Sequence, residues 1–128
     1  GFCMSKQIIE AILIILLSCG MISCSVTPKT ETQKISKLVN DNRTFLVDVR
    51  TPEEYNAEKI EGAVNIPLDQ IENRLHEFQG KKNIVVYCRS GVRAGKAKDL
   101  LQKSNIPDVY SGTSYQNVLE LKKNKTKN

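Results

Sequence analysis

The chain has no tryptophan, one histidine, and only 5% aromatic residues among its 128 positions. The histidine, His76, has Glu72 and Glu77 on the same predicted helix, a pattern typical of a solvated face. Because there is no second histidine, a Cys–His protease or a histidine-based acid–base enzyme is excluded. With so few aromatic residues, we expect a core built from Ile, Val and Leu.

Cysteine is scarce beyond the first 24 residues, where Cys88 stands alone. The chain has no CxxC pair and no Cys/His spacing typical of a metal site, so zinc and thioredoxin-like readings are excluded. A disulfide framework is excluded because Cys88 has no second cysteine within the globular part. We expect neither a metal nor another cofactor.

The net charge of +5 is modest, and the lysine-rich tail 122–128 contributes part of it. No aromatic residues are interleaved with those lysines, so we expect a solvated chain end and no nucleic-acid partner. A mildly basic surface suits a small anionic substrate.

Residues 1–24 have the pattern of a signal peptide. Lys6 precedes the apolar run Ala11–Leu17, which is shorter than the roughly 20 residues needed to cross a bilayer. The segment resembles a bacterial lipoprotein signal, in which a cysteine after a small residue receives the lipid. Cys19 and Cys24 both fit, and Cys24 is favoured because polar residues begin directly after it. A non-lipidated signal and an uncleaved anchor are the alternatives.

This interpretation divides the chain into a leader (1–24), a polar linker (25–32) and a globular domain (33–128). It predicts an exported protein of the periplasm or cell envelope, attached to a membrane through an N-terminal lipid.

Short apolar runs alternate with helical patterns throughout the globular domain. The expected strands are 44–49, 62–67, 84–87 and 109–110. The expected helices are 33–40, 52–59 with a Thr51/Glu54 capping box, 69–80 capped by Asp69, 94–104, and a last helix from 115. This alternation predicts an α/β fold with a small parallel sheet covered by helices on both faces.

The clearest chemical signal lies around Cys88. The apolar strand Ile84–Tyr87 leads into this cysteine, and a short loop and a helix follow. Backbone N–H groups and the dipole at a helix start favour an anion, and the thiolate is the nucleophilic form of cysteine. An inert core cysteine is the alternative, but the following Arg-Ser-Gly-Val-Arg has no core periodicity. Cys88 is therefore predicted to be a catalytic nucleophile.

Three ordered blocks of sequence resemble the rhodanese family of sulfurtransferases. They are 48–55 (DVRTPEEY), 60–68 (IEGAVNIPL) and 85–94 (VVYCRSGVRA), and with Val109–Tyr110 they span nearly everything after residue 33. The exported, single-domain character is most similar to small periplasmic members of the phage-shock type. The chain departs from the family at Ser111–Tyr115, where many members have Gly-Gly and then tryptophan near the substrate entrance.

The resemblance implies a reaction in which Cys88 takes sulfane sulfur from a small anionic donor such as thiosulfate. The resulting persulfide passes its sulfur to cyanide or a thiol. In the family the backbone of the loop binds the outer sulfur, which assigns this role to Arg89, Ser90, Gly91, Val92 and Arg93.

The resemblance also suggests roles for individual charged residues. Arg89 is expected to meet the anionic donor, and Arg93 is expected to brace the loop with Asp48 as its partner. Asp48 and Arg50 support the site in this reading, and the alternative is that they form a structural ion pair.

Three other functions compete with this interpretation. A cysteine phosphatase or arsenate reductase of the same fold has one more residue between cysteine and arginine than the four between Cys88 and Arg93. A non-catalytic binding or sensing module commonly lacks the cysteine. Thiol redox chemistry would need an external resolving thiol.

Overall fold

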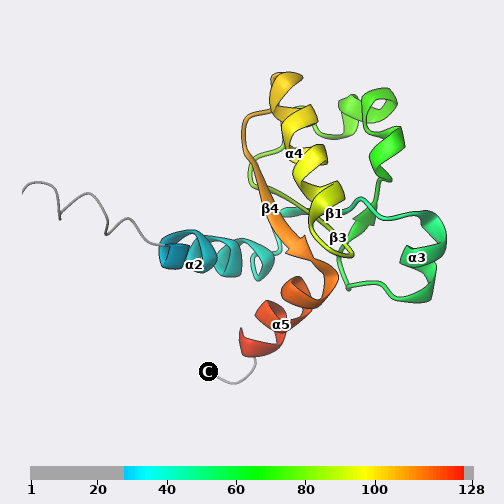
Figure 1. The fold of residues 1–128 in the computed structure, drawn as a ribbon. Helices are drawn as coiled ribbons and strands as arrows, with labels where there is room; N and C mark the ends of the chain where they lie inside the picture. Colours follow the sequence, from blue (N-terminus) through cyan, green and yellow to red (C-terminus); the bar gives the residue numbers. More distant parts are fainter. Residues whose placement is uncertain (1–27, 126–128) are drawn as a thin grey trace, which may run out of the picture. The chain divides into compact units, whose positions relative to one another are not determined.

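The computed structural model describes residues 28–125. The leader and both candidate lipidation cysteines lie outside the described residues. In chain order the elements are α2 (Pro28–Val39), β1 (Phe45–Asp48), α3 (Pro52–Ala57), β2 (Val64–Asn65), the 3₁₀ segments η1 (Leu68–Gln70) and η2 (Glu72–Glu77), β3 (Ile84–Cys88), α4 (Val92–Lys103), β4 (Val109–Ser114) and α5 (Tyr115–Lys125) (Figure 1). None of the helices in this described part combines the length and the apolar character needed to span a membrane.

Within residues 28–125, four strands form one parallel sheet in the order β2-β1-β3-β4. Because all strands run the same way, their carboxyl ends meet at one edge, where Asp48 and Cys88 end the two central strands. The register between β3 and β4 shifts by one residue, since Val86 pairs with Ser111 but Tyr87 pairs with Thr113. The predicted parallel sheet is confirmed.

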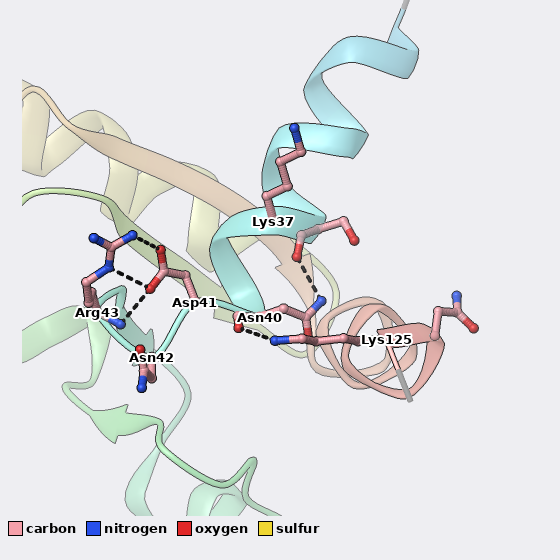
Figure 2. Close-up of a pocket in the computed structure, with 8 residues that line it drawn as sticks. Lys37, Asn40, Asp41, Asn42, Arg43 and Lys125 are labelled. Carbon is pink, nitrogen blue, oxygen red and sulfur yellow. Dashed lines mark hydrogen bonds and ion pairs between the residues drawn. The ribbon is translucent and has the colours of Figure 1, made fainter. Parts of the chain in front are cut away.

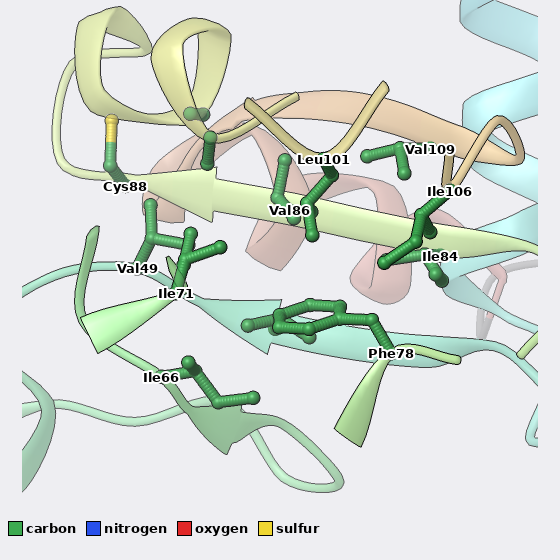
Figure 3. Packing of buried hydrophobic residues seen from close by; sticks show 13 residues of the cluster. Val49, Ile66, Ile71, Phe78, Ile84, Val86, Cys88, Leu101, Ile106 and Val109 are labelled. Atoms are coloured by element: carbon green, nitrogen blue, oxygen red, sulfur yellow. The ribbon is translucent and has the colours of Figure 1, made fainter. Parts of the chain in front are cut away.

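Strand β3 separates two hydrophobic clusters by alternating its side chains. Ile84, Val86 and Cys88 belong to a cluster that includes Phe78 and Leu101 of α4 (Figure 3). Its other residues, Val85 and Tyr87, belong to a second cluster with residues of α2 and α5. This two-residue period places helices on both faces of the sheet, as expected from the sequence.

The capping box of α3 is confirmed. Thr51 Oγ1 accepts a hydrogen bond from Glu54 N at 3.2 Å, and Glu54 Oε1 accepts one from Thr51 N at 3.3 Å. Pro52 follows at the first helical position, where its missing N–H costs nothing.

Several predicted boundaries were wrong. The helix expected over 69–80 is two 3₁₀ segments, because Asp69 makes no capping bond and Arg74 has a non-helical φ of −126°. Helix α2 begins at Pro28, inside the segment interpreted as a linker. Strand β4 continues to Ser114 instead of ending at Tyr110.

Gly95, inside α4, provides a test of packing around this helix. A Cβ at this position would meet nothing within 4 Å, so Gly95→Ala is expected to stabilise the protein by about 0.5–1 kcal/mol. Gly112→Ala is the contrasting variant, because its Cβ would lie 2.9 Å from Val118 and 3.0 Å from Val85. Urea unfolding of both variants checks the prediction, and a loss of stability for Gly95→Ala would contradict it.

Candidate functional site

The thiol of Cys88 lies at the carboxyl end of β3, beneath the loop that leads into α4. The residue is fully buried, and Figure 3 shows the sulfur at the end of the strand. The backbone N–H of Gly91 donates a hydrogen bond to Sγ at 2.9 Å. The thiol itself donates a long hydrogen bond of 3.7 Å to the carbonyl of Thr113. A negative charge on this sulfur would therefore meet a backbone donor at the start of α4.

Gly91 allows the loop to curve over the sulfur. Its φ of +101° lies in the left-handed region that favours glycine. A Cβ at this position would stand only 2.8 Å from Cγ2 of Thr113, so the loop and β4 approach each other closely here. Arg89, Ser90 and Val92, the other residues of this loop before Arg93, are exposed.

Arg93 does not pair with Asp48, so that prediction was wrong. Its guanidinium forms a two-point ion pair with Glu54, with Nη1 2.7 Å from Oε1 and Nη2 3.0 Å from Oε2. The hydrogen bond from Arg93, with help from the backbone and hydroxyl of Thr51, lowers the pKa of Glu54 to about 2. Asp48 is unavailable to Arg93 because its carboxylate is already engaged.

Asp48 pairs instead with Arg50, two residues along the chain. The Arg50 Nη2 atom lies 2.7 Å from Asp48 Oδ2, and Nε donates at 2.9 Å to the same oxygen. Arg50 also donates to the carbonyl of Glu58, and its guanidinium stacks 4.8 Å from the ring centre of Tyr115. Both partners are buried, and the ion pair named above as the alternative is present.

Burial, reinforced by Asp48, raises the pKa of Tyr87, which keeps this phenol neutral. Tyr87 directly precedes Cys88 in the sequence but packs on the opposite face of the sheet. Tyr87 therefore helps to hold the end of β3 in place through packing, and its side chain does not line the surface around Cys88.

A pocket of about 670 Å³ lies beside the loop. Arg89 lines this pocket from the loop, and Tyr115, the first residue of α5, lines it as well. The remaining lining residues are Arg50, Glu54, Ala57, Glu58 and Gln116. The pocket thus brings together residues from three connections at the carboxyl edge of the sheet.

A larger hollow of about 790 Å³ lies elsewhere, and none of residues 88–93 lines it. Figure 2 shows that its polar groups largely bind one another: Arg43 pairs with Asp41 at 2.9 Å, and Lys125 donates to the carbonyl of Asn40 at 3.0 Å. Asn40 also donates to the carbonyl of Leu121 at 3.1 Å. These contacts join the end of α2 to α5, which is a structural role.

A family model for the rhodanese-like domain matches residues 31–123. The chain belongs to the rhodanese family. Its fold agrees with that assignment: the human single-domain sulfurtransferase TSTD1 superposes with a TM-score of 0.59 at 27% identity, covering 69% of this chain and 91% of TSTD1.

Two curated relatives extend the comparison to bacterial proteins. Thiosulfate sulfurtransferase PspE of Escherichia coli K12 is 34% identical over 74 residues, which cover 56% of this chain and 71% of PspE. The uncharacterized protein YqhL of Bacillus subtilis 168 is 28% identical over 106 residues, covering 77% of this chain and 84% of YqhL. This rhodanese-family chain therefore has relatives named for sulfur transfer.

Sequence reasoning missed two contributors to the site. Glu54 was interpreted only as a capping residue, because its partner Arg93 lies 39 positions away. Thr113 was outside the predicted strand, and its approach to Gly91 and Cys88 depends on the register shift in β4. No local pattern in the sequence indicates either contact.

Proposed function

We propose that this rhodanese-family protein is a sulfurtransferase that carries sulfane sulfur as a persulfide on Cys88, from a donor such as thiosulfate to a thiol or cyanide. The observation that supports it most directly is the Gly91 N–H aimed at Sγ at the start of α4. Relatives named as thiosulfate sulfurtransferases support the activity class.

The chemistry needs no oxidant or reductant beyond the two substrates. The Cys88 thiolate attacks the outer sulfur of thiosulfate and forms an S–S bond. The S–S bond of thiosulfate breaks, and sulfite leaves with the bonding electron pair. The acceptor then attacks the outer sulfur of the persulfide, and the Cys88 thiolate departs unchanged. The loop N–H groups stabilise the negative charge at each stage.

The test is a mass measurement on the full chain. After incubation with thiosulfate, we expect the wild-type protein to gain the mass of one sulfur atom on the tryptic peptide Asn83–Arg89, and cyanide to remove it. Cys88→Ser is the matched control, because it keeps the size of the side chain and leaves the leader cysteines in place. The variant should gain nothing on this peptide.

An unmodified wild-type peptide with thiosulfate, and again with polysulfide, would overturn the proposal. It would favour a non-catalytic binding module. If the persulfide forms with polysulfide but not with thiosulfate, the proposed sulfur transfer through Cys88 stands and the donor is polysulfide instead of thiosulfate.

The leader supports a second part of the proposal, that the protein is exported and held at a membrane by a lipid on Cys24 or Cys19. Cys24→Ser is expected to abolish incorporation of labelled fatty acid into the protein in a bacterial host, while Cys19→Ser leaves it intact. The opposite pattern would assign the lipid to Cys19. A wild-type protein that incorporates no labelled fatty acid would contradict a lipid anchor.

A further inference from the structure

The carboxylate of Glu54 is engaged on two sides. Oε1 accepts from the backbone N–H of Thr51 at 3.3 Å and lies 3.2 Å from the hydroxyl of that residue. The same carboxylate receives both terminal nitrogens of Arg93, at 2.7 and 3.0 Å. Glu54 therefore connects the first turn of α3 with the first turn of α4, where Arg93 is the second residue.

The two loop arginines consequently differ in their charge balance. Arg93 is only 32% exposed at its side chain, and its positive charge is offset by a partner of opposite sign. Arg89 is exposed and forms no ion pair with any residue of 28–125. The Asp48–Arg50 pair close by has no net charge of its own. Of the two glutamates that line the pocket, Glu54 and Glu58, Glu54 is the one paired with a loop arginine, so it sets how much of the charge of Arg93 the loop presents.

We propose that Glu54 is a positioning residue of the site: it holds the loop through Arg93 and cancels that charge, leaving Arg89 as the cation that meets an anionic donor. The inference rests on the proposed function of Cys88. The side chain of Glu54 hydrogen-bonds to Thr51 and Arg93 and to no residue from Cys88 to Val92, so its hold on the loop passes through Arg93.

Removing either member of the pair has opposite electrostatic consequences. Glu54→Gln keeps the shape of the side chain and an oxygen that accepts from Arg93, but it exposes the positive charge of Arg93 to the loop. Arg93→Gln instead leaves the negative charge of Glu54 without its partner. A purely structural role would loosen the loop in both variants and shift any readout in the same direction.

The test compares an anionic and a neutral alkylating reagent, iodoacetate and iodoacetamide, on Cys88 of the full chain. Both reagents attack the same thiolate, so the ratio of their rates cancels the thiolate fraction and the accessibility of the sulfur. The modified tryptic peptide Asn83–Arg89 reports on Cys88 separately from the leader cysteines. The ratio therefore measures the electrostatic potential at the loop.

We expect the iodoacetate-to-iodoacetamide ratio to rise about threefold in Glu54→Gln and to fall about threefold in Arg93→Gln. This is the order of effect of one unit charge acting through a largely aqueous dielectric. Glu53→Gln is the matched control, since it removes the same charge from a neighbouring, exposed position of α3. Its ratio should stay close to that of the wild type.

Ratios that move the same way in both variants, or a Glu54→Gln shift no larger than that of Glu53→Gln, would overturn the inference. Circular dichroism identifies a variant that fails to fold, and the folded member of the pair must still show the shift with its stated sign. Alkylation requires no sulfur donor, so this result is separate from persulfide formation. A wild type that forms the persulfide, together with unchanged ratios in the variants, would refute only the role of Glu54.

Discussion

Asp48→Ala is expected to lower the free energy of unfolding by about 3–5 kcal/mol. The substitution leaves the guanidinium of Arg50 buried, with the carbonyl of Glu58 and the ring of Tyr115 as its remaining neighbours. A buried charge without its counterion pays a desolvation cost that those contacts do not offset. Urea unfolding followed by circular dichroism measures the effect.

Asp41→Ala is the matched control, because it breaks an ion pair of similar geometry that is open to solvent. Arg43 lies 2.9 Å from Asp41, but its side chain is 86% exposed. Such pairs contribute little, so the unfolding transition of this variant should coincide with that of the wild type. Equal losses of stability in the two variants would contradict a special role for burial at Asp48.

Gly91→Ala is expected to reduce the rate of sulfur transfer by at least about a hundredfold, because small displacements of a catalytic loop have effects of this order. The new Cβ would lie 2.8 Å from Thr113 Cγ2, and alanine is strained at a φ of +101°. Relief of both problems moves the backbone N–H away from the sulfur of Cys88. Transfer from thiosulfate to cyanide provides the measurement.

Gly80→Ala separates backbone strain from the loss of the loop geometry. Gly80 has a φ of +76°, but a Cβ there would meet nothing within 4 Å, and the residue lies outside the site. We expect this variant to lose stability, by about 1 kcal/mol, and to retain its transfer rate. A comparable loss of activity in both variants would indicate that general strain, and not the loop, limits the reaction.

Patterns carried by neighbouring residues predicted most of the fold. The apolar alternation of strands and helices predicted the parallel sheet, and Thr51-Pro52 with Glu54 predicted the start of α3 correctly. The interpretation failed at the helix expected over 69–80, because an apolar face alone does not decide between α and 3₁₀ geometry. Local capping at that position was absent.

The partners of the charged residues were harder to predict than their presence in the site. Asp48 ends β1, and Arg93 closes the loop that follows the adjacent strand β3, which made them reasonable partners. In the structure Arg50 reaches Asp48 from two residues away, and Glu54 reaches Arg93 from the next helix. The choice depends on side-chain direction and on which carboxylate is already engaged, and neither is encoded in spacing along the chain.

The register shift in β4 determines how Thr113 and Ser114 are aligned with the end of β3, where Cys88 lies. Successive side chains of a strand point to opposite faces of the sheet. Because Gly112 is skipped in the pairing, every later residue of β4 pairs one position further along than it would in a regular ladder. Without this skipped position, an uninterrupted ladder would place Thr113 instead of Ser114 opposite Cys88. The extra residue at Gly112 therefore decides which residue of β4 pairs with Cys88, so the irregular pairing of this strand is part of how the site is assembled.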